Sequence, residues 1–213
     1  MSRNIFYKSF IKNSIKDLNS KILVLGAGSL DKKIFDELNF KNVIYSNFNS
    51  KIEDQKNFKN ILLQEINLED NSYEYCVAHA CVHHSSKPHN AILEMYRVAS
   101  KGVLVIEAND CLLTRIACKL GLAEEFEKTA ILNNNLSGGV DNTNIPNFVY
   151  RWTEREIYKL ISSYKPNSKH DINFVYDYDL KFTNNVLIKF LFSIFFKIFK
   201  KQQNLLAIYI DKS

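Results

Sequence analysis

The sequence has little of what builds disulfide-linked, cysteine-metal or secreted proteins. Its 213 residues include four cysteines, none in a C-x-x-C pair, and three of them lie in apolar context. We therefore expect reduced core cysteines in a cytoplasmic protein. The apolar stretch 5–15 is interrupted by Lys8, Lys12 and Asn13, which does not match a secretory signal.

A large excess of one charge is also missing. The chain has 28 Lys+Arg against 23 Asp+Glu, a net charge of +5, and no basic block with interleaved aromatic residues. Nucleic-acid binding is therefore not expected. Hydrophobic residues make up 46% of the chain, which suits a sizeable core in one domain.

The sequence lacks an apolar run of the roughly 20 residues that span a bilayer. The longest candidate, residues 186–199, carries Lys189, Ser193 and Lys197 at i, i+4 and i+8. We interpret it as part of an apolar helix, residues 183–201, that is buried on the sheet or in a homodimer contact. The alternative is a peripheral membrane contact through residues 186–199, near a lipid-linked substrate.

Glycine is scarce, yet two of the six glycines stand in one stretch. Lys21–Leu25 has the length and apolarity of a buried parallel strand, and Gly26, Ala27 and Gly28 follow at once. Glycines around one small residue permit a tight turn and a close approach of the backbone to a ligand. A helical pattern and a second strand, residues 42–45, come next. Such a unit either binds a nucleotide-like ligand or is a βαβ unit without one.

The third glycine of the dinucleotide fingerprint is missing, because Asp31 stands at that position. A pyrophosphate would meet this carboxylate in the first helical turn, which is unfavourable. We therefore expect a ligand without phosphates.

Strand and helix patterns alternate along the rest of the chain. Strands are predicted at residues 59–63, 73–79, 103–106, 172–178 and 205–210; helices are predicted at 4–18, from Pro88 to a stop at Lys101-Gly102, at 109–128 with a break near Gly121, and at 154–164. This alternation predicts a mostly parallel sheet covered on both faces. The Asn- and Gly-rich residues 133–148 predict a long loop of the kind that is often functional.

Residues 73–110, YEYCVAHACVHHSSKPHNAILEMYRVASKGVLVIEAND, resemble the class I S-adenosylmethionine-dependent methyltransferases. In that family the fourth strand ends in a loop that often holds a His pair, and a proline-initiated helix with an E-x-x-R-V pattern follows. Residues 25–28 are similar to the family's glycine motif, so that the resemblance covers residues 21–110. Residues 146–157, PNFVYRWTEREI, look like a subgroup associated with carbohydrate or surface-polysaccharide pathways.

The resemblance implies an α/β fold: a Rossmann-like, doubly wound, mostly parallel seven-stranded sheet with helices on both faces and an antiparallel last strand. Residues 1–213 would form a single domain. Residues 21–110 would be its cofactor-binding core. Residues 111–203 would supply substrate-side helices and a loop, including the apolar helix 183–201.

The implied cofactor is S-adenosyl-L-methionine. Its expected contacts are Gly26, Ala27, Gly28, Asn47 (with Asn49 as a rival), Glu65 and His79. The family usually has a glycine where Leu30 stands and an acidic residue where Asn47 stands. A neutral amide accepts ribose hydrogen bonds through one oxygen, which is weaker than a carboxylate.

Methyl transfer to a hydroxyl needs alignment, exclusion of water and a base. His83 and His84 follow the fourth strand, where the family's reactive methyl points. Adjacent side chains on an extended segment point opposite ways, so we expect His84 to act as the base and His83 to pack. The alternative is that neither histidine takes part in catalysis.

Four residues are expected to bind the acceptor: Glu107, Asn109, Arg151 and Trp152. A Trp beside a helix start is alternatively a core residue. No metal is expected, because no carboxylate or cysteine group completes a set with the histidines.

These observations favour a cytoplasmic S-adenosylmethionine-dependent methyltransferase that methylates an oxygen of a sugar or glycoconjugate in polysaccharide biosynthesis. Its partner would be a small-molecule or glycan acceptor. The rival is a non-catalytic partner or binding protein with a degenerate cofactor site. A nicotinamide-dependent oxidoreductase is a third alternative, against which Asp31 and the His pair argue.

Overall fold

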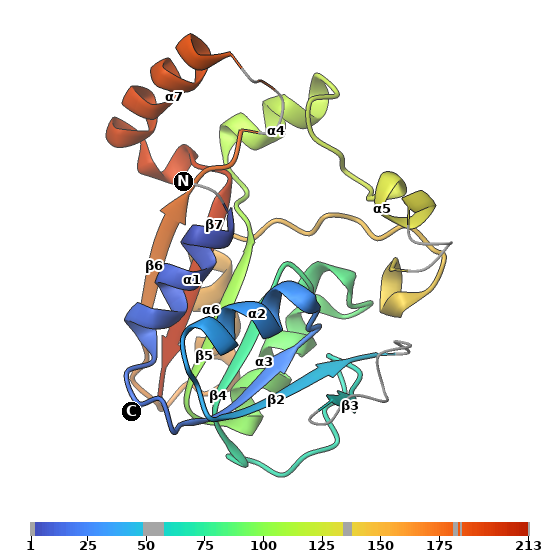
Figure 1. Cartoon of the computed structure of the whole chain (residues 1–213), viewed down its shortest axis with the longest axis vertical. Coiled ribbons are helices and arrows are strands. Elements are labelled where there is room, and N and C mark those ends of the chain that lie inside the picture. Colours follow the sequence, from blue (N-terminus) through green and yellow to red (C-terminus); the bar gives the residue numbers. More distant parts are fainter. Residues whose placement is uncertain (1–2, 49–57, 134–137, 181–182, 184, 213) are drawn as a thin grey trace.

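The computed structural model describes residues 3–48, 58–133, 138–180, 183 and 185–212. They form one sheet with helices on both faces (Figure 1). The strands are β1 (Lys21–Leu25), β2 (Asn42–Asn47), β3 (Phe58–Asn60), β4 (Tyr73–His79), β5 (Ala99–Ala108), β6 (Asp171–Asp177) and β7 (Leu205–Asp211). The helices are α1 (Arg3–Ser14), α2 (Ser29–Glu37), α3 (Pro88–Val98), α4 (Leu112–Lys119), α5 (Lys128–Asn133), α6 (Glu154–Tyr164) and α7 (Val186–Ile198), with short 3₁₀ turns η1 (Val82–His84), η2 (Val140–Asn142) and η3 (Lys200–Gln202).

Within these residues the sheet has seven strands in the order β3-β2-β1-β4-β5-β7-β6. Strands β1 to β5 pair in parallel, whereas β7 is antiparallel to both β5 and β6. The predicted doubly wound sheet with an antiparallel last strand is therefore confirmed. The strand order reverses between β1 and β4, and ligands of such sheets bind beyond the carboxyl ends of the strands at that point.

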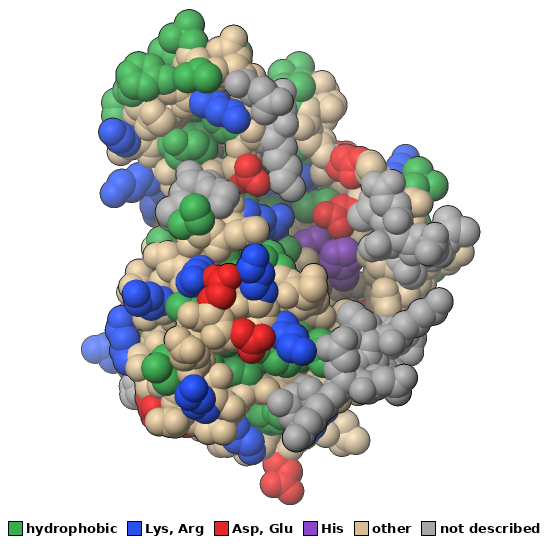
Figure 2. Space-filling view, viewed as in Figure 1, with side chains coloured by type: hydrophobic (Ala, Val, Ile, Leu, Met, Phe, Trp, Pro, Cys, Tyr) green, Lys and Arg blue, Asp and Glu red, His purple; other side chains and the backbone are tan. Residues whose placement is uncertain are grey.

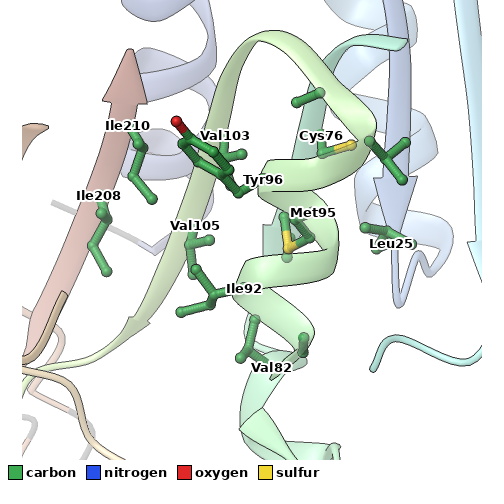
Figure 3. Close-up of a cluster of buried hydrophobic side chains, with 14 of the residues drawn as sticks. Leu25, Cys76, Val82, Ile92, Met95, Tyr96, Val103, Val105, Ile208 and Ile210 are labelled. Carbon is green, nitrogen blue, oxygen red and sulfur yellow. The ribbon is translucent and has the colours of Figure 1, made fainter. Parts of the chain in front are cut away.

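Alternate residues of the central strands face two separate cores. Leu23, Cys76 and Val103 face the side covered by α3 and α6. Ile22, Val77 and Leu104 face α1 and α2. Figure 3 shows Ile92, Met95 and Tyr96 of α3 beside strand residues from β1, β4, β5 and β7, including Leu25, Cys76, Val105 and Ile208. Because successive side chains of each strand pack into opposite cores, the strands and their ends are held at fixed positions.

The predicted stop at Lys101-Gly102 is wrong. Helix α3 ends at Val98 and β5 begins directly at Ala99. The pairing of β4 with β5 shifts between Tyr73 and Tyr75, which marks a bulge before Gly102. A Cβ on Gly102 would lie 2.6 Å from the Tyr209 ring of β7, so that the glycine serves close packing inside a strand.

The predicted burial of α7 on the sheet is also wrong. Among the described residues of α7, Phe196 is the buried one. Figure 1 shows α7 beyond one end of the sheet, on the same side as α4. Apolarity along the sequence predicted the helix but not its surroundings. A homodimer contact through it stays a prediction.

Candidate functional site

A cavity of about 260 Å³ lies at the switch point of the sheet. We call it the glycine-turn cavity. Its wall includes Gly26 after β1, Asn47 at the end of β2, the segment after β3, and Ala80, Cys81 and His84 after β4. The ends of neighbouring parallel strands therefore meet here, as sequence reasoning placed them.

Gly26 is the position in this wall that requires glycine. Its φ is +61°, and a Cβ there would lie 2.6 Å from the Cys81 Sγ atom. The Cys81 thiol donates a hydrogen bond to the Leu25 carbonyl at 3.2 Å. The next residue, Ala27, is fully buried in the core, so that only its backbone serves the turn. The turn therefore presents main chain rather than side chains to the cavity.

Gly28 is the N-cap residue of α2 and does not border the glycine-turn cavity. Its N–H donates to Asp31 Oδ2 at 2.8 Å, and the Tyr7 hydroxyl donates to Asp31 Oδ1 at 2.8 Å. The helix amino terminus is thus capped by the chain's own buried carboxylate. Burial raises the pKa of Asp31, although these hydrogen bonds oppose the rise. The Asp31 side chain therefore occupies the position at this helix end where a phosphate would bind.

Asn47 lies at the end of β2 and borders the cavity. Its Oδ1 atom accepts from the Phe48 N–H at 2.8 Å, and its Nδ2 group donates to the Ala27 carbonyl at 3.3 Å. The amide is therefore fixed against the glycine turn. Its rival, Asn49, lies outside the described residues.

Glu65 does not border the cavity, contrary to prediction. Its carboxylate is exposed, and Oε1 lies 3.9 Å from Lys87 Nζ. The neighbouring Gln64 occupies the wall instead, buried and bonded through its amide to Ser85, Ser86 and Asp141. The cause is the short β3, which ends at Asn60 rather than Leu63 and so changes which residue faces inward.

His79 also lies away from the cavity. It alternates with Ala78 along β4 and therefore points to the face covered by α1. Its ring stacks on Tyr7 with centroids 4.2 Å apart, and the Arg3 Nε–H donates to its Nε2 atom at 3.2 Å. Burial, followed by the Arg3 cation, lowers the pKa of His79 to about 4. This half-buried ring packs against α1 rather than facing the cavity.

His83 is held between two carboxylates. Its Nδ1 atom lies 2.6 Å from Glu107 Oε2, and its Nε2 atom lies 3.5 Å from Glu127 Oε1. Burial opposes a charge on the ring, but the two carboxylates prevail and raise the pKa of His83 to about 10. The two carboxylates therefore favour the imidazolium form of His83, in which both ring nitrogens carry a proton.

His84 lies in the wall of the glycine-turn cavity beside this ion pair. Its Nε2 atom is 3.4 Å from Glu127 Oε2, and its ring centroid is 4.4 Å from that of His83. Burial and then the His83 cation lower the pKa of His84. The pKa values of the two rings are thus shifted in opposite directions, that of His83 upward and that of His84 downward. The division of roles between the two histidines stays a prediction.

Glu127 was missed by sequence reasoning. It lies 43 positions after His84, just before α5, and no local motif marks it. The His83 ring, whose Nε2 atom lies 3.5 Å from Glu127 Oε1, lowers the pKa of Glu127 to about 2, although burial opposes this. His83, His84 and Glu127 offer ligand atoms within 4.8 Å of one another, so these three residues could hold a divalent metal. Glu127 is thus the carboxylate beside the histidines that the sequence analysis did not find.

A second cavity, of about 690 Å³, adjoins the first at Ala80, which borders both. We call it the α4–α7 cavity. His83 and Glu107 stand at its inner end, after β4 and within β5. Its other walls carry apolar side chains of α4 and α7 and the polar Arg3, Arg151, Asp179 and Asn204. The histidines therefore lie between two adjoining cavities.

Of the predicted acceptor contacts, Arg151 borders the α4–α7 cavity. Trp152 does not: it is fully buried in the core against His89 and Tyr150, so it cannot stack on a sugar. The Asn109 amide is used within the fold, donating to the Lys201 and Gln203 carbonyls at 2.9 and 2.7 Å. A position beside a strand end was thus insufficient to predict whether Trp152 and Asn109 bind an acceptor.

Glu107 borders the cavity but has both oxygens engaged. Oε1 accepts from the Val82 N–H at 2.7 Å, and Oε2 pairs with His83. Its side chain is fully buried, and the His83 cation lowers its pKa against the effect of burial. Glu107 therefore positions His83 rather than binding acceptor hydroxyls.

The loop predicted between α5 and α6 contributes to the glycine-turn cavity. Gly138, Gly139, Asp141 and Asn142 border it. The Asp141 carboxylate accepts from the Gln64 amide at 2.9 Å, and the Asn142 amide donates to the Phe48 carbonyl at 2.7 Å. The loop is therefore joined to the segments after β2 and β3. Residues 134–137 lie outside the described residues.

Residues 37–106, about a third of the 213 residues, match the family described as a methyltransferase domain. The structure is similar to the YcgJ protein from Bacillus subtilis, with 13% identity, a TM-score of 0.61 and coverage of 97% of this chain and 98% of that chain. A search of curated protein sequences found no match.

Similar structures that contain bound SAH, the demethylated form of S-adenosylmethionine, include those of two methyltransferases. One is magnesium protoporphyrin IX methyltransferase from Synechocystis, with 10% identity, a TM-score of 0.55 and coverage of 99% of this chain and 82% of that chain. The other is the plantazolicin methyltransferase BpumL, with 15% identity, a TM-score of 0.56 and the same two coverages. At such identities the likeness shows the fold, which is the Rossmann-like methyltransferase fold.

Proposed function

We propose that this protein is an S-adenosylmethionine-dependent O-methyltransferase whose acceptor is a sugar or glycoconjugate. The observation that carries the proposal is the placement of His84. This neutral imidazole borders one cavity, and its charged neighbour His83 borders the next. A base at the junction of two adjoining sites suits transfer of a group from one site to the other.

The residues of the glycine-turn cavity fit S-adenosylmethionine. The positive φ of Gly26 opens the backbone to a close approach, and Asn47 offers an amide at the end of β2. Ile61 and Leu62 supply an apolar wall beside it. Asp31 caps α2 and leaves no phosphate site, which suits a cofactor without phosphates and disfavours NAD.

When bound, the cofactor supplies a methyl group already activated on a sulfonium. The chain then has to align the acceptor oxygen, exclude water and accept the acceptor's proton. His84 is the group for that proton, since His83 is already protonated. Glu127 contacts both rings and holds His84 in place.

The choice of acceptor is supported by the α4–α7 cavity and by a sequence resemblance. Arg3, Arg151 and Asp179 offer both donors and acceptors for hydroxyl groups. Residues 146–157 look like a polysaccharide-associated subgroup. We accordingly place the reaction in polysaccharide biosynthesis in the cytoplasm.

Cofactor binding by the wild-type protein is the first test. Calorimetric titration with S-adenosylmethionine or SAH should give saturable heat, and titration with NAD should give none. The physical reason is the absence of a place for a pyrophosphate beside Asp31. No heat with either S-adenosylmethionine or its demethylated product SAH would favour the rival, a non-catalytic partner protein whose site is degenerate at Leu30 and Asn47.

A pair of Asn47 variants tests the contact at the end of β2. Asn47→Asp should tighten S-adenosylmethionine binding by about fivefold, because a charge-assisted hydrogen bond to ribose is about 1 kcal/mol stronger than a neutral one. Asn47→Leu has a similar volume and should weaken binding by a comparable factor. Equal affinities for all three proteins would assign the ribose contact to another residue.

A further inference from the structure

The exposed surface of α7 is almost entirely apolar. Val186 is 81% exposed, Leu187 65%, Phe190 58%, Leu191 57% and Ile198 71%. Figure 2 shows apolar side chains gathered over this end of the molecule, with Lys and Arg side chains bordering them. Apolar side chains gathered on one surface in this way commonly mark a contact with a protein or a membrane.

Helix α4 adds a second apolar surface at the same end. Leu112 is 62% exposed, Ile116 is 42% exposed, and Leu120, directly after the helix, is 68% exposed. Helices α4 and α7 both wall the α4–α7 cavity, and the Leu113 N–H donates to Gln202 beyond α7 at 3.3 Å. The exposed apolar surfaces therefore flank the cavity that we assign to the acceptor.

The charged side chains of α7 and of the residues directly after it are of one sign. Lys189, Lys197, Lys200 and Lys201 are exposed, and residues 186–203 contain no acidic residue. Lys201 reaches back to Glu154 at 2.6 Å. In a symmetric dimer through α7, these lysines would face the partner's identical lysines and repel. Apolar side chains with a basic fringe instead match a bilayer that carries anionic headgroups.

We propose that α7 and α4 form a docking surface for an anionic membrane and that the α4–α7 cavity takes its acceptor from that membrane. Among the described residues there is no helix with the length and apolarity needed to cross a bilayer, so the contact is peripheral. The acceptor would be a glycan on a lipid carrier, its polar part reaching Arg151 and His84. This second statement rests on the proposed function, whereas the membrane contact does not.

Vesicle binding tests the membrane contact without any turnover assay. The wild-type protein should sediment with vesicles of phosphatidylglycerol and phosphatidylcholine at least tenfold better than with phosphatidylcholine alone, and high salt should reduce binding. The double variant Phe190→Ser, Leu191→Ser should lose this binding. Both side chains are largely exposed, so folding should be preserved. Ile5→Ser, an exposed apolar change on α1, is the matched control and should bind like wild type.

The vesicle experiment tests the membrane contact independently of the proposed function. Equal sedimentation of wild type and the double variant would overturn the membrane contact. A dimer in wild type that becomes monomeric in the double variant, without vesicle binding, would assign the surface to a second copy of the chain. Cofactor titration of the same proteins reports on the proposed function, and a failure there leaves the vesicle result unchanged.

Discussion

Replacing His84 with alanine is expected to lower turnover by about 10²- to 10⁴-fold, the usual contribution of a positioned general base. Cofactor affinity should stay within a few-fold of wild type, because the ring lies on the His83 side of the cavity rather than at the glycine turn. The measurement is single-turnover methyl transfer to an identified acceptor, with calorimetric titration of the cofactor alongside. His84→Asn is the companion variant, since it keeps a polar side chain but cannot take up a proton.

The His84 prediction can fail in two informative ways. Full turnover in His84→Ala would leave alignment alone to explain the rate. Loss of wild-type turnover on treatment with EDTA, with recovery on adding a divalent cation, would give the role to a metal held by His83, His84 and Glu127. If the base is His84 itself, EDTA should leave turnover unchanged.

Glu107→Ala is expected to lower the free energy of unfolding by about 3 kcal/mol, because it breaks a buried ion pair and leaves the His83 ring without this partner. The substitution leaves the Val82 N–H without its acceptor and His83 without its closer carboxylate. Release of a proton from His83 would limit the loss, which places it at the lower end of the usual range. Urea denaturation followed by circular dichroism measures the change.

Three comparisons separate the Glu107 ion pair from general effects. Glu107→Gln keeps an acceptor for Val82 and should lose less stability than Glu107→Ala. Glu65→Ala, an exposed change, should shift stability by less than about 0.5 kcal/mol. Adding His83→Leu to Glu107→Leu should recover part of the loss, since it removes both charges at once. An unchanged midpoint for Glu107→Ala would contradict the importance of the pair.

The sequence predicted the central strands well because their apolar runs are continuous. Strands β1 and β4 have the predicted bounds, Lys21–Leu25 and Tyr73–His79. Strand β5 begins earlier than predicted. The prediction was late because Lys101 and Gly102 have the composition of a turn. Their role in a strand depends on Tyr209, which comes more than 100 positions later. Packing partners of that kind leave no local signal.

The candidate site was predictable in outline and less so in its members. Gly26, Asn47 and the His pair follow strands, and strand ends meet at one edge of a parallel sheet. His79 was placed in the site although the same alternation directs it toward α1. Glu127 could not be found, because its contact with the histidines depends on the path of a long connection. A fully buried Trp152 and an exposed α7 show that apolarity does not by itself distinguish a core from a surface.

The contact between Gly26 and Cys81 has a consequence for the chemical safety of the proposed enzyme. A thiolate is a strong nucleophile and would compete with any acceptor hydroxyl for an activated methyl group. Burial, reinforced by the charges of Glu107 and Asp31, raises the pKa of the Cys81 thiol well above its ordinary value. The sulfur beside the glycine turn therefore favours its protonated form. The lack of a side chain at Gly26 leaves room for this sulfur, and in the proposed enzyme a protonated thiol would limit alkylation of the protein by its own cofactor.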